Sequence, residues 1–153
     1  MFSSSGLLLL NLALALLLTG LIWTIQWVHY PLFLQVGQDA FKGYHHAHNM
    51  AITPLVAPLM VVELGAAFAL IFARPSGTPG WTLWLSVGLV LLAWFSTFLL
   101  SVPSHDRLGQ GFVRGELQFL VSTNWIRTIA WTARSFLLFV LTLRLLVPPS
   151  GES

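Results

Sequence analysis

Residues 7–28 read LLLLNLALALLLTGLIWTIQWV, an apolar run that contains no charged side chain. As a helix that rises about 1.5 Å per residue, this run is long enough to cross the roughly 30 Å hydrocarbon core of a bilayer. It differs from a secretory signal because no Lys or Arg precedes Leu7, and because it continues into the aromatic residues Trp23, Trp27 and Tyr30. Such aromatic groups anchor helices at the membrane interface, so we expect a retained transmembrane helix.

Three further apolar runs of similar length follow, at residues 52–73, 81–101 and 126–147. Of the 153 residues, 56% are hydrophobic and only 8% are charged, and the mean hydropathy is +0.81. Soluble domains contain about 25% charged residues, and this length allows about four or five membrane crossings. The sequence therefore predicts one integral membrane domain, residues 1–153, with an all-α fold: an antiparallel four-helix transmembrane bundle.

The composition also excludes several classes of protein. The high hydrophobic content excludes a disordered chain, a nucleic-acid-binding protein and a secreted disulfide scaffold. Cysteine is absent, so no thiolate can act as a nucleophile or metal ligand, and a net charge of +2 is too small to indicate an anionic partner. The expected partner is the lipid bilayer of a bacterial plasma membrane, without nucleic acid, and both homo- and hetero-oligomers stay open.

The connections between the runs place most polar residues on one face of the membrane. Residues 74–80 form a tight turn with two prolines and two glycines, whereas the other connections are longer, the first with a short interfacial helix at about 39–50. We define side A as the face that the first helix reaches at its end, and side B as the opposite face. Antiparallel topology brings all five histidines to side A: His29, His45, His46, His48 and His105. The positive-inside rule predicts that side A faces the cytoplasm, because its cationic residues outnumber those of side B: Lys42, Arg107, Arg114 and Arg127 against Arg74 and Arg144. The alternative is that the side A arginines serve the chemistry of a site and do not set the topology.

The histidines within residues 44–49, Tyr-His-His-Ala-His-Asn, form the first candidate site. Helical spacing puts His45, His48 and Asn49 on one face. A complete metal site needs three or four ligands, and the candidate ligands are His29, His45, His48 and His105. The spacing matches no specific metal motif, and histidines also suit the headgroup level, where the ring is apolar and its tip is polar. A metal is therefore one possibility, beside a cofactor-free site and a purely interfacial role.

A polar stripe on the fourth helix forms the second candidate site. Asn124, Arg127, Trp131 and Arg134 follow three-four-three spacing, so they lie on one face, which must point into the bundle. An unpaired guanidinium deep in hydrocarbon is expensive, so Arg134 needs a partner, and Glu63 on the second helix lies within its reach. The simplest interpretation is a buried ion pair between Glu63 and Arg134 that fixes helix register. Alternatively, one of the two arginines binds an oxyanion, or Glu63 moves protons.

Three tryptophans at a similar depth form the third feature. Trp23, Trp94 and Trp131 each lie five to eight residues inside the side A end of a predicted helix. Such aromatics can fill the interior of a bundle, or they can line a flat, mostly apolar pocket that binds a small molecule. Because the polar stripe and the histidines meet the tryptophans at the same end, we expect a pocket between the first, third and fourth helices, with Asn124 and Arg127 at its mouth.

Four segments of the sequence resemble a known family. The third helix ends in Val102-Pro-Ser-His105, and Asn124-Trp-Ile-Arg-Thr128 opens the fourth, which resembles the anthrone-oxygenase-like family of small four-helix membrane proteins. The aromatic end of the first helix and the segment Asp39-Ala-Phe41 resemble it as well. The family's characterised members oxidise aromatic polyketide anthrones to quinones without a bound cofactor. The resemblance implies roles for four residues, Pro103, Asn124, Arg127 and Thr128. The chain departs from the family pattern at His105, where Asn is commoner, and in its His45 to His48 segment.

We therefore expect an oxidoreductase or oxygenase that acts on a hydrophobic, aromatic or quinone-like molecule. In this interpretation His48 or His105 acts as the base, and Arg127 and Asn124 stabilise the oxyanion. The residues expected to bind the substrate are Trp23, Trp94, Trp131 and Thr128. The alternative is a non-enzymatic membrane protein, either an accessory subunit of a larger complex or a small carrier.

Overall fold

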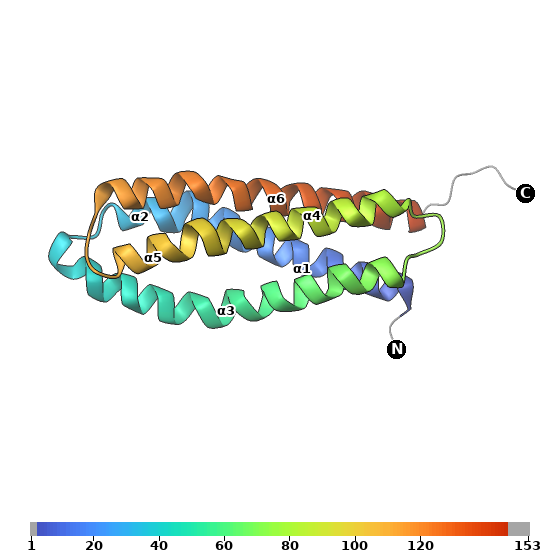
Figure 1. The fold of residues 1–153 in the computed structure, drawn as a ribbon, viewed down its shortest axis with the longest axis horizontal. Coiled ribbons are helices and arrows are strands. Elements are labelled where there is room, and N and C mark those ends of the chain that lie inside the picture. The colour runs from blue at the N-terminus through green and yellow to red at the C-terminus, as the bar shows by residue number, and fades with distance from the viewer. Residues whose placement is uncertain (1–2, 147–153) are drawn as a thin grey trace, which may run out of the picture.

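The computed structural model describes residues 3–146, and within them the chain is an all-α four-helix bundle. The four long helical rods lie side by side along the long axis of the molecule (Figure 1). Each rod is long and apolar enough to cross a membrane: Ser4–Phe33, Gln38–Phe72, Gly80–Leu108 and Arg114–Leu146. By the length and composition of these helices, the chain is an integral, multi-pass membrane protein.

Two of the rods are interrupted by a wider helical turn. The first rod consists of α1 (Ser4–Thr24), the π-helical turn η1 (Ile25–His29) and α2 (Tyr30–Phe33). The second is the single helix α3 (Gln38–Phe72). The third consists of α4 (Gly80–Ser96), the π-helical turn η2 (Thr97–Ser101) and α5 (Val102–Leu108). The fourth is α6 (Arg114–Leu146).

A proline follows each wide turn and explains why the turn is there. Pro31 and Pro103 have no N–H to donate, and their rings would collide with the carbonyl four residues earlier in a regular α-helix. The residue before each proline instead donates to the carbonyl five residues back, from Tyr30 to Ile25 and from Val102 to Thr97. Both wide turns lie toward the same end of the bundle, side A, where they shape the wall of the cavity described below.

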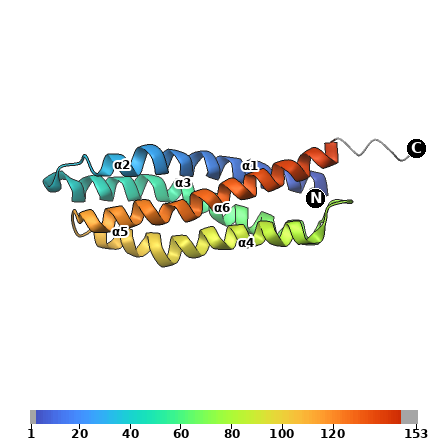
Figure 2. The same ribbon diagram turned by 90° about the horizontal axis from the view of Figure 1, so that it is seen from above.

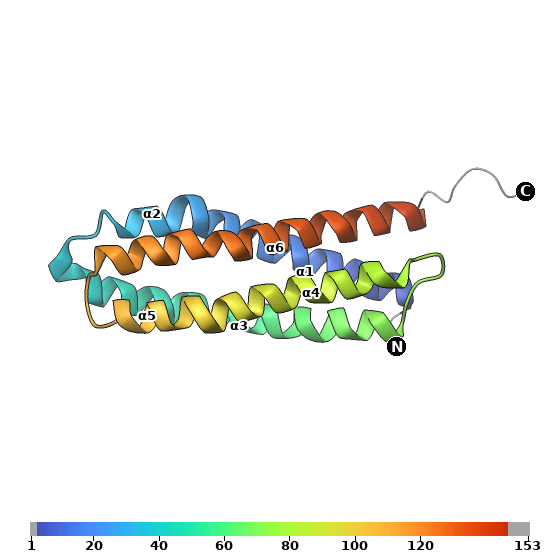
Figure 3. The same cartoon turned by 45° about the horizontal axis from the view of Figure 1, so that its top comes forward.

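The rods pack in a ring in which each contacts two neighbours, in the order α1, α6, α4 and α3. The chain turns back at each of its three connections, so residues far apart in the sequence lie beside one another (Figures 1 and 2). Side A carries the connection from α2 to α3 and the connection from α5 to α6, and side B carries the turn between α3 and α4. Figure 3 shows the ring from an intermediate angle, with α6 lying across the front of α1.

The helices extend beyond the predicted apolar runs on side A. No separate interfacial helix occupies residues 39–50, because this segment is the first part of α3, which continues through Pro54 and Pro58. The third and fourth rods likewise extend to Leu108 and back to Arg114. Hydropathy marks only the stretch that suits lipid, whereas a helix continues wherever its polar residues also find partners. Val147, the last residue of the fourth predicted run, lies outside the described residues.

Candidate functional site: a side A cavity above a buried polar layer

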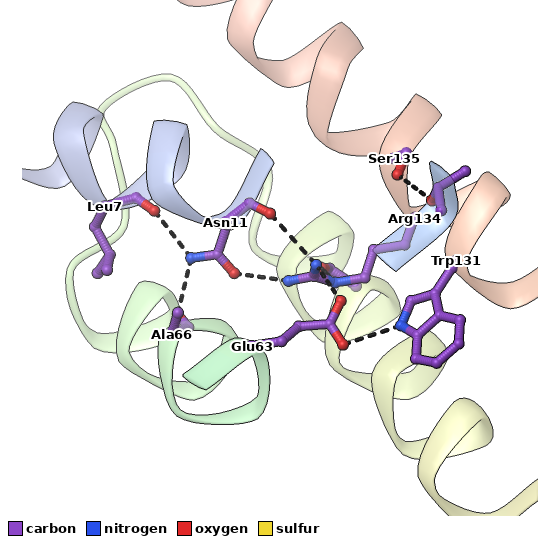
Figure 4. Close-up of polar contacts among 9 residues, drawn as sticks. Leu7, Asn11, Glu63, Ala66, Trp131, Arg134 and Ser135 are labelled. Atoms are coloured by element: carbon purple, nitrogen blue, oxygen red, sulfur yellow. Dashed lines mark hydrogen bonds and ion pairs between the residues drawn. The ribbon is translucent and has the colours of Figure 1, made fainter. Parts of the chain in front are cut away.

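A polar layer crosses the middle of the bundle. Arg134 Nη1 on α6 lies 2.8 Å from Glu63 Oε1 on α3, and neither side chain is exposed. Trp131 Nε1 donates to the other carboxylate oxygen, Glu63 Oε2, at 3.0 Å. The close-up in Figure 4 shows the arginine and the indole meeting the carboxylate from the same helix. The structure therefore brings together the two charges for which the sequence predicts an ion pair.

The remaining donors of Arg134 bind the other two rods. Its Nη2 donates to Asn11 Oδ1 on α1 at 2.7 Å, and its Nε donates to Ser86 Oγ on α4 at 3.1 Å. Asn11 in turn donates to the carbonyl oxygens of Leu7 and Ala66, both at 2.9 Å (Figure 4). Asn11 and Ser86 are not among the predicted site residues, although Asn11 is the single polar residue of the run 7–18. Because every rod contributes, this layer ties the bundle together, and its donors and acceptors are engaged with one another.

A cavity of about 460 Å³ lies between this polar layer and the side A end of the bundle. All four rods line it, and most of its wall is apolar. Trp131 joins the two features, because it lines the cavity and also donates to Glu63. The titratable and amide side chains of the wall come from α2, α3, α5 and α6: Tyr30, His48, Asn49, His105, Asp106 and Arg127. A volume of this size is ordinary for a small-molecule site.

Arg127 is the buried cation of the cavity. Only 8% of it is exposed, and the ion pairs among the described residues, Arg107 with Glu116 and Arg134 with Glu63, do not include it. Its guanidinium instead donates to neutral oxygens: to Asn124 Oδ1, to the Tyr30 hydroxyl at 3.4 Å and to Thr97 Oγ1 at 3.5 Å. A guanidinium that is held by neutral groups keeps its positive charge uncompensated, so the wall of the cavity favours an anion.

The histidines of side A associate in two pairs. His45 Nε2 and His105 Nδ1 are 3.0 Å apart, and His29 Nε2 and His48 Nδ1 are 2.7 Å apart. The second ring nitrogen of His105 lies 3.2 Å from the Tyr30 hydroxyl. Tyr30 therefore contacts both Arg127 and His105, which makes it the central hydroxyl of the site. From the sequence, Tyr30 is expected only to be an interfacial anchor, because nothing in its spacing distinguishes it from other aromatic residues at the membrane interface.

Several buried polar atoms of the cavity wall have no hydrogen-bond partner among the described residues. They are Trp94 Nε1, Ser101 Oγ and Arg127 Nε. Buried polar atoms are normally paired, because an unpaired one costs about 1–3 kcal/mol. Their concentration around one cavity indicates a surface suited to a molecule that brings hydrogen-bonding oxygen atoms.

Three of the residues predicted to bind the substrate or take part in its reaction lie outside the cavity wall. Trp23 stacks on Trp27 and meets the edge of Trp125, and its Nε1 donates to Thr132 Oγ1 at 3.0 Å. Equal depth did not place Trp23 in the pocket, because depth does not decide which face of a helix a side chain occupies. Thr128 and Asn124 are buried but do not line the cavity.

Asn124 instead holds Arg127 in place. It accepts from the guanidinium through Oδ1, and its Nδ2 donates to Gln26 Oε1 in η1 at 2.7 Å. Thr128 donates its hydroxyl proton to the Asn124 carbonyl oxygen at 3.1 Å. Gln26, which is not among the predicted site residues, therefore supports the arginine through Asn124. The pocket also differs from the prediction in its walls, since α3 contributes to them.

The paired histidines do not fit a metal centre. Within residues 3–146 no group of three or more His, Asp and Glu side chains is arranged to hold a metal ion. In each pair a ring nitrogen of one imidazole faces a ring nitrogen of the other at hydrogen-bond distance, so these nitrogens bind each other and do not converge on a common point. The four histidines proposed as ligands are thus better suited to hold and pass protons.

The chemistry of the site is concentrated at one end of an apolar cavity. A cation, a phenol and an imidazole meet within hydrogen-bond distance at the side A end, and the indoles of Trp94 and Trp131 line the apolar part. This arrangement suits a flat hydrophobic ligand with an oxygen atom at one edge. Comparison of the chain with protein-family models, with curated proteins and with solved structures found no match.

Proposed function

We propose that this protein is a membrane oxidoreductase of the anthrone-oxygenase-like kind, which binds a flat, phenolic or quinone-like molecule in the side A cavity and oxidises it with dioxygen. The observation that carries the proposal is Arg127, a buried cation without an ion-pair partner among the described residues, on the wall of an apolar cavity. Such a preorganised donor stabilises the enolate or phenolate that forms when the ligand loses a proton.

The oxidation needs only the ligand, dioxygen and a proton that the protein holds for part of the reaction. The anthrone CH₂, which is conjugated with the carbonyl through the two flanking aromatic rings, loses one proton to the protein, and the molecule becomes an enolate whose oxygen lies next to Arg127. Dioxygen adds to its carbon as a peroxide anion, which takes the same proton back. The hydroperoxide then eliminates water, so that CH₂ and O₂ become C=O and H₂O. The protein needs only to hold the anion, store one proton and exclude bulk water.

Tyr30, His105 and His45 form the proton store. Because the Tyr30 oxygen accepts from Arg127, its own proton is free for His105 Nε2. The proton of neutral His105 then resides on Nδ1, from which it donates to His45 Nε2. A proton that Tyr30 takes from the ligand is relayed along this chain and leaves His45 as the cation. His48, the other imidazole of the cavity wall, is the second candidate base.

The test is oxidation of 1,8-dihydroxyanthrone by the purified protein in lipid nanodiscs, followed through quinone absorbance and oxygen uptake. We expect one oxygen molecule to be consumed per quinone formed. Replacing Arg127 with Leu should lower turnover by about 10²- to 10³-fold, the usual effect of losing an oxyanion donor. Arg107→Leu is the matched control, because this side A arginine pairs with Glu116 and does not line the cavity.

Each alternative has its own outcome in the same experiment. If the wild-type protein binds the anthrone and its quinone but does not oxidise the anthrone, the carrier alternative replaces the enzyme. If it binds neither compound, the accessory-subunit alternative is favoured. An Arg127→Leu protein that cannot fold would make Arg127 structural and would remove its role in stabilising the oxyanion.

A further inference from the structure

The cavity reaches the outer surface of the bundle between α3 and the η2–α5 segment. Along α3 its wall has two rows of residues, each with four-residue spacing. The inner row consists of His48, Ile52, Val56 and Met60, and Met60 is 5% exposed. The outer row consists of Asn49, Thr53, Ala57 and Val61, and Val61 is 58% exposed. A residue that lines the cavity and also faces outward stands at the rim of an opening.

The third rod supplies the opposite rim. Its inner lining residues include Ser101, which is buried, whereas its outer row consists of Phe98, Val102 and Asp106. Phe98 is 56% exposed and Val102 is 41% exposed. The two outer rows therefore form the two edges of one slot, with Asn49 and Asp106 at the side A end and, apart from Thr53, apolar residues along the rest.

The other side of α3 faces α1 and is not part of this slot. Leu55 and Leu59 lie there, in a shallow groove with residues of α1 such as Leu17 and Gly20. On a helix these leucines point roughly opposite to Ala57 and Val61. The slot consequently opens on the α3 and η2–α5 side, at a depth where residues 52–73 are predicted to be surrounded by lipid.

We infer that the ligand is a membrane-dissolved molecule which enters the cavity sideways from the bilayer, through the slot between Thr53, Ala57 and Val61 on one rod and Phe98 and Val102 on the other. The chemistry of the ligand, a flat apolar body with one acidic oxygen, rests on the proposed function. An apolar slot lets the rings pass without entering water, and its polar end allows the ligand oxygen to move alongside Asn49 toward Tyr30 and Arg127. Ligands that prefer lipid to water are concentrated at this opening, which favours capture.

The experiment measures how fast a ligand enters and leaves. The probe is 1,8-dihydroxyanthraquinone, added to phosphatidylcholine vesicles that contain the protein, and its arrival is followed by stopped-flow quenching of tryptophan fluorescence. Ala57→Phe and Val61→Phe narrow the slot. Their matched controls are Ala51→Phe and Val62→Phe, at exposed positions of the same helix that do not line the cavity.

We expect each slot variant to slow both association and dissociation by about tenfold, while the dissociation constant changes much less. The two control variants should behave as the wild-type protein does. Asn49→Phe, at the polar end, tests the competing route from water. If Asn49→Phe slows association and the slot variants do not, the ligand enters from side A and lateral access is wrong. Unchanged rates in Ala57→Phe and Val61→Phe would also overturn it.

The outcomes separate this inference from the proposed function. A wild-type protein that shows no quenching overturns the inference, because no ligand of this class then occupies the cavity. A protein whose quenching is slowed by Ala57→Phe but which does not oxidise 1,8-dihydroxyanthrone retains the lateral opening and loses the proposed enzymatic activity. Quenching that palmitate prevents as effectively as an excess of the quinone would show an acyl-chain site and would overturn the flat-ring ligand.

Discussion

At the residue scale, two arginines on the same face of α6, two helical turns apart, have opposite surroundings. Arg134 is fully buried and meets a carboxylate, an amide and a hydroxyl, so each side of its guanidinium is compensated. Arg127, two turns nearer side A, is held by neutral oxygens alone among the described residues. The same residue type on the same stripe therefore stabilises the fold at one depth and prepares a binding site at the other.

Removing one charge from the buried pair should cost more than removing both. Glu63→Gln and Arg134→Met each leave the partner without its countercharge, which costs about 3–5 kcal/mol. The double variant Glu63→Leu with Arg134→Leu leaves only neutral groups such as Asn11 unpaired, so we expect its loss of stability to be smaller than either single loss. Thermal unfolding of all three variants in the same detergent checks the order of these losses of stability. A double variant that is less stable than both single variants would contradict the assigned role of the pair.

Removing the hydroxyl of Tyr30 should slow the reaction and leave binding intact. Tyr30→Phe keeps the ring, which packs near Phe33, but breaks the link between Arg127 and His105. We expect kcat for the anthrone to fall by about 10²-fold, as for loss of a positioned proton-transfer group, with KM little changed. Quinone binding by fluorescence quenching provides the control. If Tyr30→Phe turns over at the wild-type rate and His48→Gln does not, His48 is the base.

At the scale of elements, prolines set the shape of the rods around the cavity. Pro31 and Pro103 follow the wide turns η1 and η2, and Pro54 and Pro58 lie within α3 beside the slot residues Thr53 and Ala57. Each proline removes one backbone hydrogen bond, and a helix bends most readily where such bonds are missing. The ribbon of α3 is bowed in Figure 1. The bend of α3 and the width of the opening to the cavity are thus coupled.

Replacing Pro54 and Pro58 together with Ala should stabilise α3 and slow the ligand. The substitution restores donors toward the carbonyl oxygens of residues 50 and 54 and removes two ring clashes, so we expect the melting temperature to rise. A straighter α3 keeps the slot narrower, and quinone association in vesicles should become slower. A single Pro75→Ala variant, in the turn on side B, controls for proline loss in general. Faster association in the α3 variant would show that the bend does not widen the slot.

At the scale of the whole molecule, the polar layer divides the bundle into halves with different tasks. On side B of the layer, residues such as Leu8, Leu83 and Leu138 form a closely packed apolar cluster. On side A, the buried cluster surrounds the cavity and includes aromatic residues such as Phe33, Phe41 and Trp131. The side B half together with the layer holds the rods in register, and the side A half is therefore free to leave room for a ligand.

The bundle should have one orientation, with side A in the cytoplasm. The chain has no native cysteine, so a single-cysteine variant can be labelled only at the position of its new cysteine. Gln38→Cys and Gln110→Cys lie in or near the side A connections, and Ser76→Cys lies in the side B turn. In intact bacterial cells a membrane-impermeant maleimide should label the Ser76 variant alone, and in inverted vesicles it should label the other two. The reverse pattern would mean that the side A arginines serve the cavity and do not set the topology.

The sequence by itself determined the four membrane helices, the inward direction of the α6 stripe and the need of Arg134 for Glu63. These follow from local physics: run length against bilayer thickness, helical spacing, and the high cost of a lone charge in lipid. Tertiary structure alone decided that Tyr30 joins Arg127 to His105, that the histidines pair with each other, and that Trp23 faces away from the cavity. The physical reason is that depth follows from counting residues along one helix, whereas contact between helices depends on rotation and wide turns, which only the packing of all four rods sets.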